Sequence, residues 1–183
     1  MTNNHDDFVK FASNPTTWVF EANCHISVWQ VLSKHAEKLL IEGNYRVEEY
    51  AGCRKAACFH AGIAIENVLK ASLVRQEPNL ISRGAVDKSR FGNKSGHGLL
   101  ELAQRVLPTL SEAETRILRK LEEHVMWAGK YSIPLKADRL FDRQVKNDLR
   151  VSLYGDNQIL QQLYNKLVCL ALAIPDSHET RHQ

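Results

Sequence analysis

Apolar side chains recur every three or four positions between Trp18 and Leu40, and polar residues fill most of the positions between them. This 3.6-residue period predicts an amphipathic helix. Asn14-Pro15 is a start signal, because Asn caps helices and Pro fits their first turn, and Gly43 is typical of a helix end. We therefore expect a helix over about 15–43, preceded by a flexible N-terminal arm at 1–14.

A second helix is expected over about 47–76. Its centre, CRKAACFHAGIAIENVLKASLV, is apolar on nearly every face, which is typical of a helix packed on several sides. Pro78 ends the pattern. Small residues in this centre let neighbouring helices approach closely, among them Ala56, Ala57, Ala61, Gly62 and Ala64.

Residues 77–96 show no period and contain three glycines, so we expect an exposed loop. The loop has an excess of positive charge. Its basic side chains are the candidates for contact with phosphate groups: Arg83, Lys88, Arg90 and Lys94.

Further helices are expected after this loop. One spans about 97–107, and the next follows Ser111 and Glu114, which have the spacing of a capping box, and runs to Gly129. Asp156 is expected to cap a last helix that stops at Pro175, before a disordered tail at 176–183.

No alternating pattern of useful length predicts a strand. We therefore predict an all-α fold, an up-and-down bundle of four to five helices in a single domain over 15–175, with a turn and a short or irregular helix between 130 and 155.

The composition fits this picture. The 183 residues carry 24 Lys plus Arg and 21 Asp plus Glu, and 44% of them are hydrophobic, which is typical of one globular domain rather than a disordered chain, a coiled-coil rod or a disulfide scaffold. No run approaches the roughly 20 apolar residues of a spanning helix, and the N-terminus has no apolar signal segment. We expect a cytoplasmic protein without membrane contact.

Four cysteines lie in apolar helical patterns, and we expect them to be buried, reduced thiols. Cys53 and Cys58, five positions apart on a helix, face different directions. The spacing therefore predicts no metal site, and no motif indicates a cofactor.

The second helix holds an unusual polar set within its apolar run: His60, Glu66, Asn67 and Lys70. Glu66 and Lys70 stand one turn apart in the favourable order for an ion pair, and His60 and Asn67 share a face. Two interpretations stay open: a structural network between packed helices, or a ligand groove or subunit interface.

Three segments together resemble the HEPN superfamily: CFHAGIAIENVLKASLV, the His-led HGLLELAQRV, and LRKLEEHVMWAGKYSIP. The resemblance covers roughly residues 45–135. Many members have Arg-Tyr-Pro where this chain has Lys130 and Tyr131, followed by Ser-Ile-Pro, so we expect Lys130 and Tyr131 to belong to the ligand site or the interface as well. The resemblance implies a compact helical domain, usually a homodimer, of the kind found in toxin–antitoxin, defence and RNA-processing systems.

Nuclease members of this superfamily cleave RNA without metal, using an Arg and a His separated by four to six residues. The His would act as general base or acid, and the Arg would stabilise charge on the phosphate. The chain has three such pairs: Arg54 with His60, Arg90 with His97, and Arg119 with His124. The last two are the candidate catalytic pairs, although the Asn that often follows the Arg in active nucleases is absent from all three.

Other members bind nucleotides or pair with a nucleotidyltransferase. The leading hypothesis is therefore a HEPN-like domain that binds RNA or nucleotides, or pairs with a nucleotidyltransferase, an antitoxin or a defence partner, as a homodimer. The alternatives are a metal-independent endoribonuclease and a helical protein-interaction module without a nucleic-acid role.

Overall fold

The computed structural model describes residues 4–43, 46–82, 85–86, 91, 97–128 and 155–173. Almost all of them are helical, so the predicted all-α class is confirmed for this part of the chain. The elements, in chain order, are α1 Asn4–Ala12, α2 Pro15–Glu42, α3 Val47–Gln76, the 3₁₀ turn η1 Pro78–Leu80, β1 Ile81–Ser82, β2 Ala85–Val86, α4 Leu99–Val106, α5 Glu112–Glu123, the π-helical turn η3 His124–Ala128, and α8 Gly155–Leu172.

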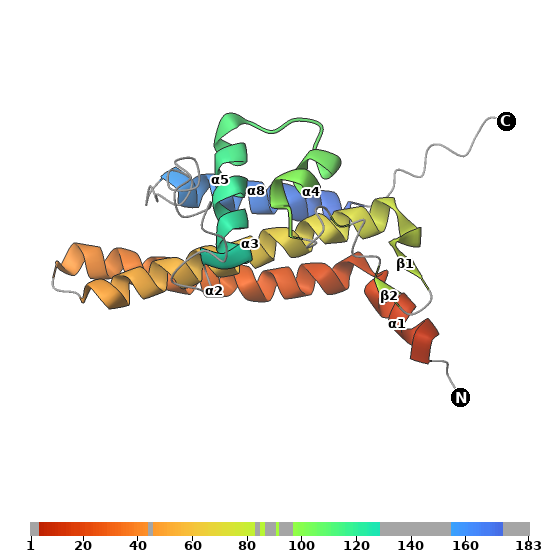
Figure 1. Cartoon of the computed structure of the whole chain (residues 1–183), viewed down its shortest axis with the longest axis horizontal. Helices are drawn as coiled ribbons and strands as arrows, with labels where there is room; N and C mark the ends of the chain where they lie inside the picture. Colours follow the sequence, from red (N-terminus) through yellow and green to blue (C-terminus); the bar gives the residue numbers. More distant parts are fainter. Residues whose placement is uncertain are drawn as a thin grey trace.

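The helices α2 and α3 form a long antiparallel hairpin along the longest axis of the molecule (Figure 1). Both lie within a residue of their predicted bounds. The Asn14 side chain caps α2 by accepting a hydrogen bond from the Thr16 backbone N–H, and Gly43 ends the helix in the left-handed region at φ 67°. The start and stop signals read from the sequence therefore act as predicted.

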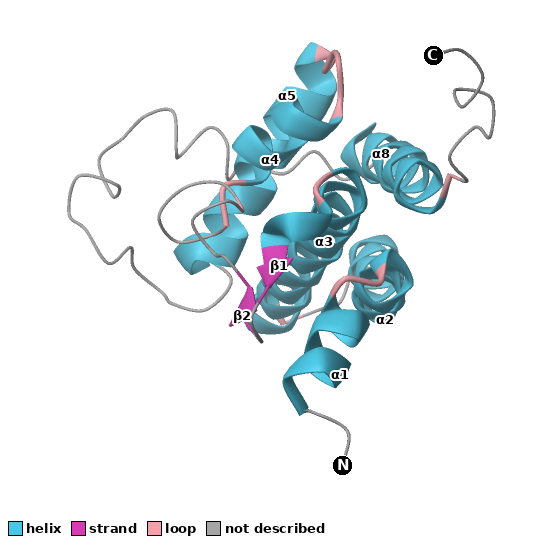
Figure 2. Ribbon diagram, turned by 90° about the vertical axis from the view of Figure 1, so that its right-hand side faces the viewer, coloured by secondary structure: helices cyan, strands magenta, loops and turns pink. Residues whose placement is uncertain are grey.

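The helix α3 lies at the centre of the fold, with α2, α4, α5 and α8 around it (Figure 2). Its small residues provide the close approach predicted from the sequence: a Cβ on Gly62 would collide with Val125 and approach the Leu121 carbonyl oxygen. By length and composition α3 could also cross a membrane, but 72% of its most apolar stretch is buried within this fold, as in the core helices of globular proteins.

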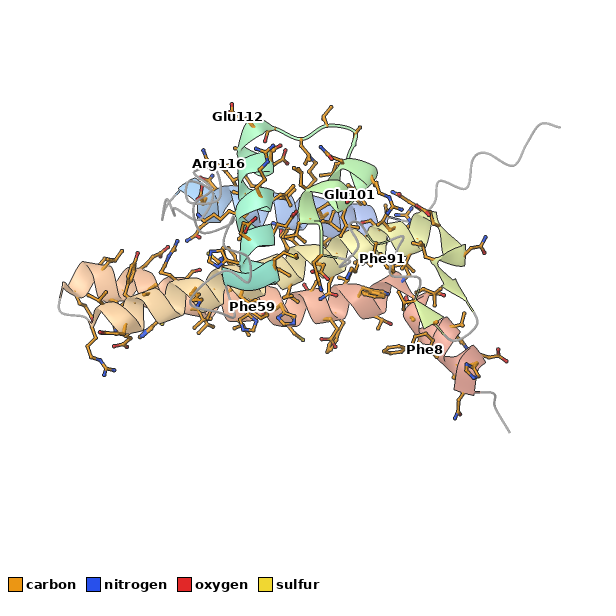
Figure 3. The ribbon with its side chains drawn as sticks, in the orientation of Figure 1. Phe8, Phe59, Phe91, Glu101, Glu112 and Arg116 are labelled. Atoms are coloured by element: carbon orange, nitrogen blue, oxygen red, sulfur yellow. The ribbon has the colours of Figure 1, made fainter. Side chains whose placement is uncertain are left out.

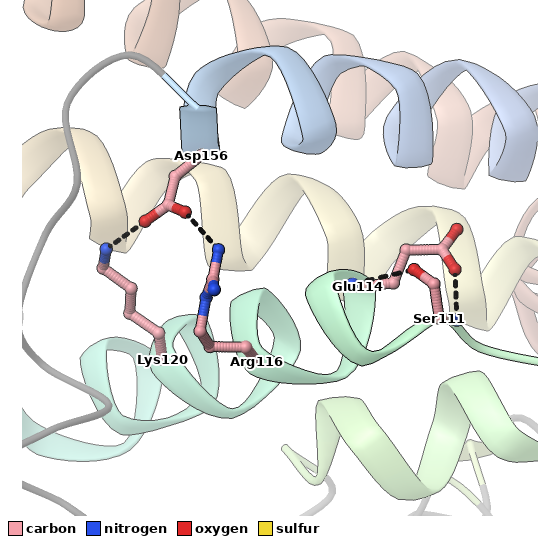
Figure 4. A network of polar contacts seen from close by, with 5 residues as sticks. All are labelled: Ser111, Glu114, Arg116, Lys120 and Asp156. Carbon is pink, nitrogen blue, oxygen red and sulfur yellow. Dashed lines mark hydrogen bonds and ion pairs between the residues drawn. The ribbon is translucent and has the colours of Figure 1, made fainter.

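The helix α5 crosses α3 steeply, whereas α8 runs nearly along it (Figure 1). The capping box that opens α5 is present: the Glu114 N–H donates to Ser111 Oγ, and the Ser111 N–H donates to the Glu114 carboxylate. Asp156 does not cap α8 as predicted. It lies inside the first turn, and its carboxylate accepts hydrogen bonds from Arg116 and Lys120 of α5 instead, because those cations offer stronger partners (Figure 4).

Two segments differ from the sequence expectation. Residues 4–12 form α1 rather than an arm, because Ala12 is buried against the core and its carbonyl oxygen accepts a hydrogen bond from Trp18 Nε1. Within the predicted exposed loop, Ile81 pairs with Val86 in a short antiparallel ladder, and Phe91 is buried. Burial of these apolar side chains outweighs the polar composition around them.

The cysteines are free, as expected, but only one of them is fully buried. Cys58 is buried and Cys53 partly so, whereas Cys24 and Cys169 are exposed on α2 and α8. The expected burial is therefore wrong for Cys24 and Cys169, because an apolar pattern does not show which positions the neighbouring helices cover.

Candidate ligand-binding site

The buried carboxylate of Glu66 joins two groups that are distant in sequence. On one side, Lys70 Nζ donates to Oε1 at 2.5 Å, and on the other, His97 Nδ1 lies 2.9 Å from Oε2. The Glu66 side chain is 7% exposed, that of Lys70 14%, and that of His97 39%. The cluster therefore runs from the interior at Glu66 to the surface at His97.

Helix geometry and the start of α4 together place these three groups. Glu66 and Lys70 lie one turn apart on α3, which confirms the ion pair predicted from their spacing. His97 lies two residues before α4, which packs on α3, and this contact brings its ring to the carboxylate. The sequence could not show the second contact, because the two residues are 31 positions apart.

The carboxylate fixes the orientation of the imidazole. A carboxylate only accepts hydrogen bonds, so Nδ1 carries the proton that it donates to Glu66. The other ring nitrogen, Nε2, then lies on the opposite edge of the ring from Glu66. A histidine held in one tautomer by a buried carboxylate is an arrangement suited to proton transfer or to binding an anion.

Two aromatic rings extend the cluster away from Lys70. Lys70 Nζ lies 5.5 Å from the centroid of the Phe91 ring, within cation–π range. The Phe91 ring in turn lies 5.9 Å from that of Trp18 on α2. Phe91 lies towards the same end of the hairpin as Phe8, whereas Phe59 lies near its middle (Figure 3).

A pocket of about 250 Å³ opens beside Trp18, between α1, α2 and α3. Its walls are largely apolar, and the polar side chains of Thr17, Glu21 and Asn67 reach it. The Thr17 hydroxyl donates a hydrogen bond to the Phe11 carbonyl oxygen, whereas the side chains of Glu21 and Asn67 have no hydrogen-bond partner among the described residues. The remaining lining residues are Phe8, Phe11, Ala12 and Val86. An apolar pocket with a few polar groups is the usual form of a small-molecule site.

His60 does not join this cluster. Its Nδ1 atom lies 2.8 Å from Nδ1 of His25 on α2, and its ring lies edge-on to Phe59. Burial and the neighbouring His25 lower the pKa of His60. The structure thus separates the predicted set: Glu66 and Lys70 share a site with His97, Asn67 lines the adjacent pocket, and His60 belongs to the contact between α2 and α3.

The structure does not bring Arg119 and His124 to a common surface. Arg119 is exposed on α5, whereas His124 is 7% exposed in the π-helical turn, and neither of its ring nitrogens has a hydrogen-bond partner. Burial, together with the charges of Lys120, Lys55 and Arg54, lowers the pKa of His124 to about 4. His124 is therefore neutral at physiological pH and shielded from a ligand the size of RNA.

Several predicted residues lie outside the described part of the chain. They are Arg83, Lys88, Arg90, Lys94, Lys130 and Tyr131. Of the predicted pair Arg90 and His97, only His97 is described.

Sequence reasoning missed a second polar cluster, between α2, α3, α5 and α8. Arg54, Lys120 and Asp156 lie on three different helices and line one small cavity. Arg54 was considered only as a partner of His60, and Lys120 was not among the candidate residues. One signal in the sequence could have indicated their burial: Arg54 and Lys120 each lie next to positions of the apolar stripe of their helix.

Comparison with known protein families, with curated proteins and with solved structures finds no match to this chain.

Proposed function

We propose that this protein is a HEPN-like helical domain that binds RNA or nucleotides, with phosphate bound near His97 and Lys70. The supporting observation is the pairing of His97 and Lys70 on one buried carboxylate, which directs a partly exposed imidazole towards the surface. A histidine oriented in this way donates hydrogen bonds to phosphate oxygens when it is protonated.

The adjoining pocket supports the same proposal. Phe91 and Trp18 connect Lys70 to its rim, and its aromatic wall offers stacking surface for a base. The Asn67 amide can both donate to and accept from the edge of a base. A nucleotide would place its base beside Trp18 and its phosphate towards Lys70.

Direct binding measurements test this function. Fluorescence anisotropy with short labelled RNA oligomers, and calorimetry with nucleoside phosphates, are run at 50 and 200 mM salt, because phosphate contacts weaken as salt rises. We expect His97→Ala and Asn67→Ala each to weaken binding about tenfold. Lys38→Gln, which removes an exposed cation of α2, serves as the control and should bind as the native protein does. Equal affinity for all four proteins would reject the proposed site.

A metal-independent endoribonuclease is the second candidate function, and the orientation of His97 favours it. His97 would take the proton from a ribose 2′-hydroxyl as that oxygen attacks the adjacent phosphorus and the bond from phosphorus to the 5′-oxygen breaks. The protonated His97 would then return a proton to the departing 5′-oxygen, directly or through water, and a 2′,3′-cyclic phosphate would remain. Among the described candidates, His97 rather than buried His124 can reach a substrate.

Incubation with RNA in excess EDTA distinguishes the two functions. Cleavage that disappears in His97→Ala and persists in His124→Gln would establish the enzyme. Binding of RNA without cleavage by the native protein would support the binding function and reject the endoribonuclease.

We also propose that the protein is a homodimer, with a nucleotidyltransferase or antitoxin as the alternative partner. Helix α2 exposes an apolar stripe that includes Phe20, Val28 and Val31, with Phe20 64% exposed. Such stripes mark interaction surfaces. Light scattering of the native protein and of Phe20→Glu with Val31→Glu tests this: a dimer that becomes a monomer supports it, and a native monomer rejects it.

A further inference from the structure

A cavity of about 30 Å³ lies where α2, α3, α5 and α8 meet. It is lined by apolar side chains, by the thiol of Cys58, and by a polar group from each helix, Ser33, Arg54, Lys120 and Asp156, together with Asn157. A cavity of this kind needs about 10–15 Å³ to hold one water molecule. The space therefore accepts one or two atoms of that size, and a phosphate group does not fit.

Two polar groups of this cavity are buried without an adequate partner. Ser33 is 5% exposed, and its Oγ makes no hydrogen bond. Arg54 is 9% exposed, and within the described ranges it forms no ion pair; the Cys58 thiol is its hydrogen-bond partner. Buried charges in proteins are normally paired, because an unpaired buried charge strongly destabilises the folded state.

Among the described residues, no neighbouring carboxylate pairs with Arg54. The charge of Asp156 is balanced by Lys120 at 2.8 Å and shared with Arg116 at 3.0 Å (Figure 4). Burial raises the pKa of the Cys58 thiol, so it stays uncharged. The Glu37 carboxylate accepts a hydrogen bond from Asn157 and makes no ion pair with Arg54. Among the described lining residues, the cavity thus has two cations, Arg54 and Lys120, against the single carboxylate of Asp156.

We propose that this cavity binds a single monatomic anion of the size of chloride, held by the Arg54 guanidinium and the Ser33 hydroxyl. Both are donors, and the anion supplies the negative charge and the acceptor that they lack. Because its walls come from four helices, the bound anion joins α8 to the α2–α3 hairpin. The site is independent of the proposed RNA- or nucleotide-binding face, since it shares no residue with it.

Bromide, which replaces chloride and scatters anomalously, tests the site directly. Crystals grown in sodium bromide should show an anomalous peak between Ser33 and Arg54. A peak without anomalous signal would identify a water molecule and overturn the proposal.

Thermal unfolding in solution provides the second measurement. At constant ionic strength, each tenfold rise in chloride above its dissociation constant should raise Tm by about 3–5 °C, whereas gluconate, too large for the cavity, should not. Equal responses to the two salts would overturn the proposal.

A matched pair of variants makes the solution test specific. Ser33→Val fills the cavity and removes the hydroxyl, so its Tm should no longer depend on chloride. Ser27→Val makes the same change at an exposed position of the same helix and should keep the dependence. Loss of the dependence in both variants, or in neither, would contradict the assignment.

Discussion

The Nδ1 atoms of His25 and His60 lie 2.8 Å apart and join α2 to α3. At this distance one nitrogen carries the proton and the other accepts it, so the contact exists only while at least one ring is neutral. Protonation of both rings would place two N–H groups against each other. This hydrogen bond between the two longest helices therefore depends on pH.

Acidification should weaken this contact. The pKa of His60 is lower in the folded protein than in the unfolded chain, so the unfolded chain binds more protons as the pH falls below about 6.5. The contribution of His60 to the free energy of unfolding is therefore fully present above that pH and decreases below it. Denaturant unfolding at pH 7.5 and 5.5 measures the loss, which should be smaller in His60→Gln. An unchanged pH dependence in that variant would contradict this role.

His124 should produce a larger loss at lower pH. Its pKa of about 4 lies some 2.5 units below that of an unfolded histidine, so the stability present above pH 6.5 falls by roughly 3 kcal/mol as the pH decreases to 4. His124→Leu removes the ionisable group without opening a cavity. We expect the unfolding free energy of this variant to exceed that of the native protein at pH 4.5. The control variant His5→Leu, at an exposed position in the first turn of α1, should show no such gain.

Gly62→Ala should destabilise the fold. The added Cβ would collide with Val125, and separating α3 from the π-helical turn costs about 1–3 kcal/mol. Gly52→Ala is the matched control on the same helix: nothing lies near its new Cβ, so the better helix propensity of Ala should stabilise the protein by about 0.5–1 kcal/mol. Both changes are measured by urea unfolding, and a gain from Gly62→Ala would show that the helices are not in tight contact.

Glu66→Gln should affect both stability and binding. The change leaves the Lys70 ammonium buried without its counterion, which typically costs about 3 kcal/mol or more. It also releases His97 from its fixed orientation. The double variant Glu66→Gln with Lys70→Met should recover much of the stability but not the RNA or nucleotide affinity. Recovery of both would mean that the cluster only stabilises the fold.

The sequence predicted features that arise from neighbouring residues. The ends of α2 and α3 and the capping box at Ser111 follow from local capping and helix-breaking residues. The Glu66–Lys70 pair follows from spacing, because a helix places residues four positions apart on one face. Contacts between distant segments were not predictable in this way. The partner of His97 and the burial of Arg54 depend on how helices pack, and single-sequence periodicity carries no information about which helices meet.

The turn and the short or irregular helix expected between 130 and 155 fall almost entirely outside the described residues and remain predictions. The same holds for the phosphate contacts expected of the basic loop residues. The HEPN resemblance, the dimer and the RNA or nucleotide function likewise remain hypotheses, for which the orientation of His97 and the pocket beside Trp18 are the structural support.

The hairpin of α2 and α3 also bears on how the chain folds. Its two helices are adjacent in sequence, with a short connection, so their contacts cost little loop-closure entropy and can form early. The segments that follow can then assemble on a surface that already exists. In pulse-labelled refolding, amide protons in the centres of these two helices should become protected before those of α8.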